Sequence, residues 1–131
     1  RLHYQRAHSW ARLVAPETHA EMVSVQFPGL DGVLPDFGRF SPLDWGLGVI
    51  VNSAHYGEPE MPYGYGPFAG ARTFGHSGAR SSTAFADPDA GLVVALAVNG
   101  MPPDDAHRQR FERLTAALYR DLGLAREPEA G

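Results

Sequence analysis

The pattern that most constrains the fold is a pair of apolar segments within residues 81–99. Alternating apolar residues predict one strand over Ser81 to Ala86 and a second over Leu92 to Asn99. The connection Asp87-Pro88-Asp89-Ala90-Gly91 is typical of a tight turn, because proline fixes φ and glycine adopts a positive φ. Strands joined by so short a turn pair antiparallel. We therefore predict an antiparallel hairpin and interpret Asp87 and Asp89 as turn residues with solvated side chains.

Helices are predicted on both sides of this hairpin in the sequence. Pro16 suits the first turn of a short helix that ends at about Ser24. After Met101-Pro102-Pro103 ends the second strand, a longer helix is predicted from Asp104 to about Leu122, with Gly123 as its stop. Its expected apolar stripe comprises Phe111, Leu114, Leu118 and Leu122. Its expected solvated face comprises Asp104, Asp105, His107, Arg108, Arg110, Glu112 and Arg113.

A further strand is predicted over Trp45 to Val51, where large apolar residues alternate with glycines. Val93, Ala95 and Ala97 form a similarly small face on the second hairpin strand, which favours close helix packing. We therefore expect both faces of the sheet to be covered. The fold class is α/β (α+β), an antiparallel sheet with helices packed on it. Residues 1–131 form a single partial domain, in which residues 1–14 are irregular and residues 124–131 form a tail.

Two segments rich in glycine and proline, residues 27–44 and 54–72, are predicted as loops. The second is long for a plain connection, and long loops are often binding loops or lids. Its tyrosines Tyr63 and Tyr65, together with Tyr56, are therefore candidates to line a substrate pocket. Packing of this loop on the sheet is the alternative.

Composition excludes several classes of function. The net charge of -4 provides no basic surface for nucleic acid. The longest apolar runs are too short to span a membrane, and no signal-peptide pattern is present. The compartment stays open, and a cytoplasmic location is compatible with the sequence. All eleven basic residues are arginine and no cysteine occurs, which excludes disulfides, thiolate nucleophiles and lysine chemistry.

No cofactor or metal is implied by the sequence. The six histidines do not form His-x-x-x-His or His-Glu-x-x-His, the spacings typical of zinc sites. They are His3, His8, His19, His55, His76 and His107.

The sharpest candidate site is Gly75-His76-Ser77-Gly78-Ala79, at the entrance to the hairpin. Read as Gly-x-Ser-x-Ala, it matches the nucleophile elbow of α/β-hydrolases, with Ser77 as nucleophile. That elbow requires a buried strand before the serine and a helix directly after it, whereas here a hairpin is predicted to follow. A second interpretation is that the polar groups of His76 and Gly78 find nearby hydrogen-bond partners at the start of a strand and that these residues have no chemical role.

A third interpretation rests on resemblance to a known family. Several separated segments occur in order within residues 12–123, namely Trp45-Gly46-Leu47-Gly48, Gly75-His76-Ser77-Gly78-Ala79, Phe85-Ala86-Asp87-Pro88-Asp89-Ala90-Gly91-Leu92 and Val98-Asn99 before a terminal helix. Together they resemble the C-terminal part of the β-lactamase/penicillin-binding-protein-like serine hydrolases. The match is to the class C β-lactamase/esterase-like branch, in which a His-x-Gly triplet replaces Lys-Thr-Gly. The resemblance implies the C-terminal portion of the β-lactamase/transpeptidase-like fold.

The same resemblance implies roles for the residues of the triplet. His76 would supply a hydrogen bond or partial positive charge to the substrate, and Ser77 would donate a hydrogen bond rather than attack. Gly78 leaves room for a substrate against the strand backbone. The N–H of Ala79 would be the second oxyanion-hole donor, and such a donor is typically worth about 3 kcal/mol in the transition state.

Two motifs that the family needs for catalysis are missing. The nucleophile motif Ser-x-x-Lys cannot occur because the chain has no lysine, and no Tyr-x-Asn or Ser-x-Asn box is present. Both boxes normally lie N-terminal to the segment seen here, and the chain begins with arginine rather than methionine. We therefore expect the nucleophile to lie in a missing N-terminal portion and this chain to be inactive alone. Its expected partners are that portion or a second copy of itself, and in the complete protein a small-molecule ester or amide.

A function of another class stays open at this point. A non-catalytic binding or structural module, including a pseudoenzyme remnant, would also explain the missing nucleophile. Its tyrosine-rich loop would bind a ligand or protein without chemistry.

Overall fold

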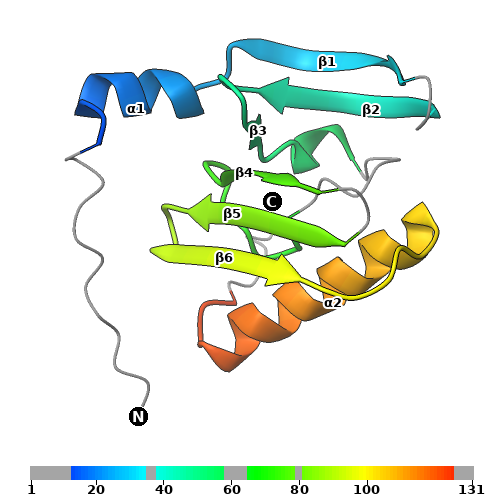
Figure 1. Cartoon of the computed structure of the whole chain (residues 1–131). Helices are drawn as coiled ribbons and strands as arrows, with labels where there is room; N and C mark the ends of the chain where they lie inside the picture. The colour runs from blue at the N-terminus through cyan, green and yellow to red at the C-terminus, as the bar shows by residue number, and fades with distance from the viewer. Residues whose placement is uncertain (1–12, 35–37, 58–64, 79–80, 126–131) are drawn as a thin grey trace.

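The computed structural model describes residues 13–34, 38–57, 65–78 and 81–125 (Figure 1). The elements in chain order are helix α1 (Pro16–Val23), strands β1 (Phe27–Leu34), β2 (Gly38–Trp45) and β3 (Ile50–Val51), 3-10 helix η2 (Ala54–Tyr56), strands β4 (Phe74–Ser77), β5 (Ser82–Asp87) and β6 (Leu92–Ala97), and helix α2 (Asp104–Asp121).

The six strands form one antiparallel sheet in which they lie in the same order as in the sequence. The predicted hairpin is confirmed as β5 and β6, with Asp87 paired to Leu92 across the turn. Gly91 in this turn has a φ of 63°, a backbone conformation that glycine adopts without strain. The predicted helices are confirmed as α1 and α2, and the predicted stop residue Gly123 has a φ of 68°.

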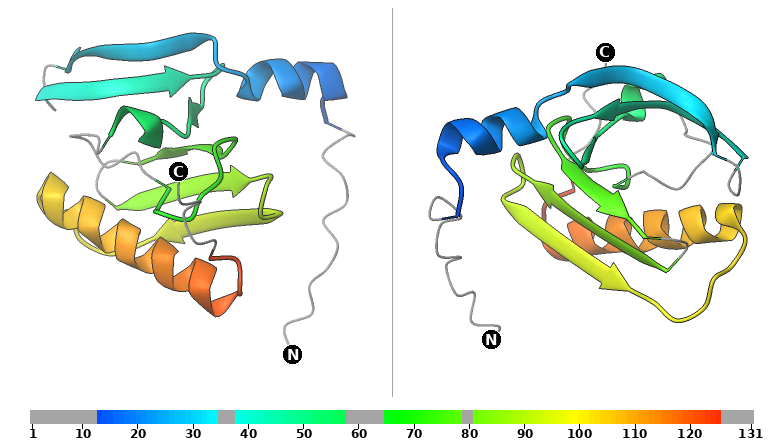
Figure 2. Two further views of the ribbon diagram at one scale, coloured as in Figure 1. Left: turned by 180° about the vertical axis from the view of Figure 1, so that it is seen from behind. Right: turned by 45° about the horizontal axis from the view of Figure 1, so that its top comes forward.

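The core lies between the sheet and α2, which crosses one face of β5 and β6 (Figures 1 and 2). Phe85 and Val94 of the sheet are buried against Tyr119 of α2 and against Tyr65, which lies in the loop before β4. This side of the sheet is therefore dry, as the alternation along β6 predicts.

The face that α2 turns to the sheet differs from the predicted one. Phe111 is buried, but Leu114 and Leu122 are exposed. Polar residues take their place, since His107 and Thr115 are both buried and lie four residues before and after Phe111. The hydroxyl of Thr115 donates to the carbonyl of Phe111 at 2.8 Å, which satisfies it within the helix. The prediction that His107 belongs to a solvated face is therefore wrong.

Residues 27–44 were predicted as a loop and instead contain the pair β1 and β2. The register between these strands shifts between Phe27 and Leu30 and again before Gly32. The first shift accommodates Pro28 and Gly29, which lie between Phe27 and Leu30, and Gly29 has a φ of 60°. Pairing with a neighbouring strand thus overrides the local preference for a loop.

Residues 45–51 form a turn between two strands rather than one strand. Strand β2 ends at Trp45 and β3 begins at Ile50, with Trp45 paired to Ile50. The N–H of Gly46 donates to the carbonyl of Val49 at 2.9 Å, and Gly48 has a φ of 78°. Apolar residues and glycines alternate here because the glycines form the turn between β2 and β3, and not because the segment is one strand.

No described element covers the second face of the sheet, which we call the open face, contrary to the prediction that both faces are covered. Val93 is 72% exposed, and the small side chains of Ala84, Ala95 and Ala97 on the same face are also exposed. At the end of this face, helix α1 buries none of its side chains against the described part of the chain. Close helix packing therefore requires an element other than those described. No helix among the described residues is long and apolar enough to cross a membrane.

Candidate functional site

His76 and Ser77 of the candidate triplet His76-Ser77-Gly78 lie on β4, inside the sheet between β3 and β5. His76 pairs with Ala84 and Ser77 pairs with Thr83. His76 is exposed on the open face, which it shares with Ala84 and Val93. Gly78 follows the strand, and its N–H donates to the carbonyl of Ser82 at 2.9 Å. The triplet is therefore placed at the end of an interior strand, where a ligand can lie against the open face.

The imidazole of His76 contacts the carbonyl of Ser77 and the ring of Trp45. Its Nδ1 lies 2.7 Å from the carbonyl oxygen of Ser77. The ring of Trp45 meets it edge to face, with 5.7 Å between the centroids and an interplanar angle of 61°. Trp45 ends β2, and its carbonyl accepts from the N–H of Gln26 at 2.7 Å. Two strands and the segment after α1 therefore fix the surroundings of this side chain.

Helix α1 reaches the same region of the sheet. His19 of α1 meets Phe74 of β4 edge to face at 5.8 Å. Phe74 lies two residues before His76 and therefore on the same face of β4. The open face near the triplet is thus bordered by aromatic rings from α1, β2 and β4.

Gly75 has a structural role that sequence reasoning missed. A Cβ placed on Gly75 would lie 2.2 Å from the carbonyl oxygen of Ala84 and 2.6 Å from Cα of Phe85. Both are backbone atoms of β5 and cannot move independently of the sheet. A Cβ on Gly78 would lie 2.2 Å from the side-chain oxygen of Ser82, which can rotate away, and no backbone atom lies nearer than 4.0 Å. The first glycine of the motif therefore permits strand pairing, and no local sequence signal distinguishes it from the second.

Ser77 does not have the surroundings of a nucleophile elbow. It ends β4, and the chain returns as strand β5 rather than as a helix. The strand-turn-helix arrangement that exposes an elbow serine is absent from this region.

The other predicted site residues are placed differently. Tyr65 is 3% exposed, packs on Phe85 and donates its hydroxyl to the carbonyl of Ile50 at 2.7 Å. It belongs to the core and not to a pocket, which corrects the prediction in favour of loop packing. Burial raises the pKa of its phenol above the ordinary range. Tyr63 and Ala79 lie outside the described residues.

Comparison with known proteins identifies the family. The Beta-lactamase family model matches residues 6–118. The chain belongs to the beta-lactamase family. A crystal structure of a beta-lactamase from Mycobacterium bovis shares 32% sequence identity and superposes with a TM-score of 0.64. The alignment covers 82% of this chain but only 38% of the Mycobacterium bovis chain. Among curated proteins, none matches the sequence significantly.

The beta-lactamase-family chain contains a buried carboxylate that the sequence analysis placed in solvent. Asp87 is 1% exposed, which corrects its interpretation as a solvated turn residue. Its carboxylate accepts from the hydroxyl of Tyr119 at 2.6 Å, and from the backbone N–H groups of Gly70, Asp89 and Ala90 at 2.9 to 3.1 Å. It therefore joins the β5–β6 turn to α2 and to the loop before β4. Asp89 is partly exposed and pairs with Arg72 instead.

These hydrogen bonds predict acid sensitivity. Burial by itself would raise the pKa of Asp87, but the donors of Tyr119, Gly70, Ala90 and Asp89 outweigh it and lower the pKa. A lowered pKa in the folded state stabilises the fold above the ordinary aspartate pKa, and this contribution is lost as pH falls through the folded value. We expect the free energy of unfolding to decrease as pH is lowered below about 4. Denaturant titrations of wild type and Asp87→Asn from about pH 6 to 3 check this. An equal decrease in both proteins would show that other groups cause the acid sensitivity.

A second buried carboxylate, Asp44, organises the opposite end of the sheet. It accepts from the N–H of Gly29 at 2.9 Å and from the hydroxyl of Tyr56 at 3.0 Å, and Nε2 of His55 lies 3.3 Å away. The hydrogen bond to this carboxylate raises the pKa of Tyr56. Tyr56 was a candidate pocket residue, and the structure gives its hydroxyl this structural partner. Asp44 therefore holds β1 and η2 to β2.

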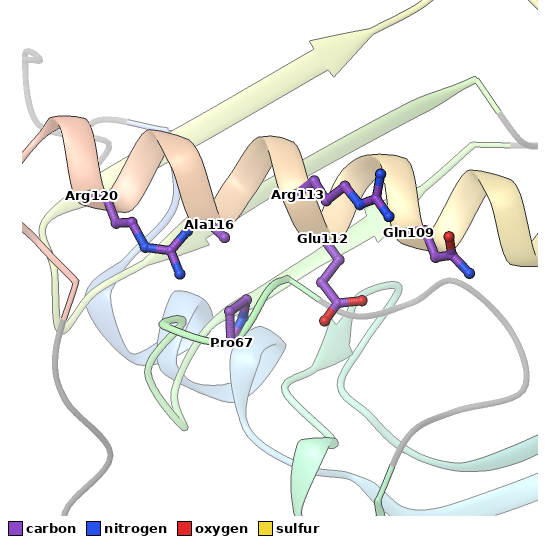
Figure 3. A pocket seen from close by; sticks show the side chains of 6 residues that line it. All are labelled: Pro67, Gln109, Glu112, Arg113, Ala116 and Arg120. Atoms are coloured by element: carbon purple, nitrogen blue, oxygen red, sulfur yellow. The ribbon is translucent and has the colours of Figure 1, made fainter.

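A separate hollow of about 440 Å³ lies beside α2 (Figure 3). It is lined by Pro67, Gln109, Glu112, Arg113, Ala116 and Arg120. The guanidinium of Arg120 lies 5.1 Å from the ring centroid of Phe68, so part of its charge is placed over an aromatic face. This hollow is on the side of α2, whereas His76 is on the open face, and the two are distinct.

Proposed function

We propose that this chain is the C-terminal portion of a β-lactamase-like serine hydrolase that cleaves an ester or amide through an acyl-enzyme. In the proposed reaction a serine outside this chain attacks the substrate carbonyl, and the alcohol or amine leaves. Water then hydrolyses the acyl-serine, which releases the acid and regenerates the serine. The observation that carries this proposal is the position of the His76-Ser77-Gly78 triplet, which ends an interior strand beside an open face.

The residues of this chain would bind and orient the substrate. The exposed imidazole of His76 would contact it from β4, and Gly78, which has no side chain, would leave room for it against the strand backbone. The resemblance gives the N–H of Ala79 the role of an oxyanion-hole donor. Because His76 replaces the lysine of the β-lactam-binding branch, an esterase-like reaction is preferred to β-lactam hydrolysis.

The open face supports an N-terminal portion as the partner that completes the site. The small side chains around Val93 leave space for an element to pack closely against the sheet, and α1 presents side chains that nothing described buries. About three-fifths of the Mycobacterium bovis chain has no counterpart here, so the alignment leaves ample sequence for such an element. The alternative partner is a second copy of this chain, which would cover the same surface.

Fluorophosphonate labelling of the purified 131-residue chain tests whether a nucleophile is present. We expect no adduct by intact mass and peptide mapping, under conditions in which a control serine hydrolase is labelled completely. An adduct on Ser77 that disappears in Ser77→Ala, but persists in the matched variant Ser81→Ala, would replace this proposal by a nucleophile within β4.

A second labelling experiment uses the protein encoded by the complete reading frame. We expect Ser-x-x-Lys and then Tyr-x-Asn upstream of residue 1, with labelling on the serine of the first motif. If both motifs are absent upstream, the binding module or pseudoenzyme remnant becomes the better interpretation.

A further inference from the structure

The hollow beside α2 has two opposite charges placed evenly about a small residue (Figure 3). Ala116 lies between Glu112 and Arg120 in the sequence and is four residues from each. A helix rises about 1.5 Å per residue, so each charged residue lies about 6 Å from Ala116 along the axis, on opposite sides of it. Residues four apart share one face of a helix, and all three therefore line the same hollow.

Both charges are accessible to a partner. Glu112 keeps 48% of its side chain exposed, and its carboxylate lies 3.8 Å from Nη1 of Arg108, beyond hydrogen-bond distance. The guanidinium of Arg120 lies 5.1 Å from the ring centroid of Phe68, a contact that holds it beside the hollow without neutralising its charge. Within the described part of the chain, no carboxylate forms an ion pair with Arg120. The hollow therefore has an exposed anion toward one end and an exposed cation toward the other.

We propose that this face of α2 is the interface of a homodimer, in which α2 of a second copy packs antiparallel across the hollow with Ala116 at the two-fold axis. Such an axis exchanges the positions four residues before and after Ala116. Glu112 of each copy then lies opposite the partner's Arg120, so the contact forms twice. A parallel pair would place Glu112 against Glu112 and Arg120 against Arg120, and both contacts are repulsive.

The small side chain of Ala116 permits the close approach that this arrangement needs. Packed helices lie about 8–10 Å apart, and the side chains at the contact determine the distance. Pro67 and the half-buried Phe68 add apolar surface at the edge of the hollow. Exposed ion pairs are screened by salt and contribute little affinity, so here they select the antiparallel arrangement more than they stabilise it. We therefore expect a weak dimer, with a dissociation constant on the order of 0.1 mM at low ionic strength.

This interface is independent of the proposed hydrolase activity. It lies on the side of α2, and the open face that carries His76 is left accessible to an N-terminal portion. The inference therefore concerns the 131-residue chain itself and is tested without a substrate.

The first test measures self-association of the 131-residue chain by sedimentation equilibrium, from well below to well above the expected dissociation constant. Glu112→Arg and Arg120→Glu each place like charges opposite each other, and we expect each to weaken dimerisation by about tenfold or more. The double variant E112R/R120E exchanges the charges and is expected to restore the wild-type constant within about threefold. Failure of the double variant to recover the association lost in the single variants would overturn the pairing.

Asp121→Arg is the matched control for Glu112→Arg. It makes the same change of charge at an exposed position of α2, but five residues from Ala116 and therefore on the other side of the helix. We expect the wild-type dissociation constant. An equal weakening by Asp121→Arg would show that net charge, and not the proposed contact, controls the association.

The second test locates the two-fold axis. The chain contains no cysteine, so a single introduced thiol can form a disulfide only with the same position of another copy. Under mild oxidation we expect Ala116→Cys to form a covalent dimer faster than Ala117→Cys. Accessibility alone predicts the opposite order, since Ala117 is exposed and Ala116 is only 7% exposed. Faster cross-linking of Ala117→Cys would place the axis elsewhere and overturn the proposal.

Val93→Arg distinguishes this interface from a contact through the open face. Val93 lies on that face, and we expect its replacement to leave dimerisation unchanged. Loss of association in Val93→Arg, with no effect of the α2 variants, would overturn the proposal in favour of the open face. A chain that is monomeric at every concentration would also overturn it. Circular dichroism of each variant checks that a loss of association is not a loss of folding, and fluorophosphonate labelling tests the proposed function separately.

Discussion

Replacing Asp87 by alanine is expected to lower the free energy of unfolding by about 3–5 kcal/mol, because several buried donors lose their acceptor and each unsatisfied group costs about 1–3 kcal/mol. The carboxylate is 1% exposed and accepts four hydrogen bonds from three separate segments of the chain. Its removal leaves the hydroxyl of Tyr119 and the N–H of Gly70 without an acceptor in the core. Denaturant unfolding followed by circular dichroism measures the change.

Two variants show whether the hydrogen bonds of Asp87 account for this loss. Asp89→Ala lies in the same turn but removes a surface ion pair with Arg72, so its expected cost is below about 1 kcal/mol. Tyr119→Phe removes one hydroxyl and keeps the ring, and we expect a loss of about 1.5–3 kcal/mol, as for a hydrogen bond to a charged group. If Asp87→Ala costs no more than Asp89→Ala, the buried carboxylate does not hold the turn to α2.

Gly75→Ala is expected to lower the free energy of unfolding by about 2–3 kcal/mol, through overpacking rather than through backbone strain. The added methyl group would lie 2.2 Å from the carbonyl oxygen of Ala84, so β4 and β5 must separate to admit it. Because His76 follows directly, the separation also displaces the imidazole from the triplet geometry. Thermal and denaturant unfolding measure the stability, and the NMR signals of the His76 ring report the displacement.

Gly48→Ala is the matched control for this glycine. Gly48 has a φ of 78° and no atom within 4 Å of an added Cβ, so its cost is conformational only, about 1–2 kcal/mol. Its substitution should leave the His76 signals in place. Wild-type stability and unchanged ring signals in Gly75→Ala would contradict the close approach of β4 and β5.

Local patterns were sufficient to predict the β5–β6 hairpin and the extent of helix α2. The turn from Asp87 to Gly91 has proline and glycine at positions with fixed backbone requirements, and the helix after Pro103 is followed by Gly123, which has a positive φ. Both signals act within a few residues. Strands β1 and β2 could not be predicted in this way, because their glycines and prolines are accommodated only by pairing with each other.

The sequence indicates where the candidate site lies but not the contacts that support it. His76 and its neighbours were found from their types and order. The burial of Asp87 depends on Tyr119, which lies thirty-two residues away in the sequence. The need for glycine at position 75 depends on the backbone of β5. Such long-range partners leave no periodic or local trace in the sequence.

The order of strands has a consequence for how the sheet opens. Each strand pairs only with strands next to it in sequence, and the two-residue strand β3 is the sole ladder that joins β2 to β4 in the described sheet. Outside the ladder, the N–H of Asn52 donates to Thr73 and its side-chain amide to Ala69 and Gly70. We therefore expect the sheet to unfold as two units joined by this narrow seam, one from β1 to β3 and the other from β4 to α2. Ile50 of this seam pairs with Gly75, so partial unfolding that separates the units would begin one residue from His76.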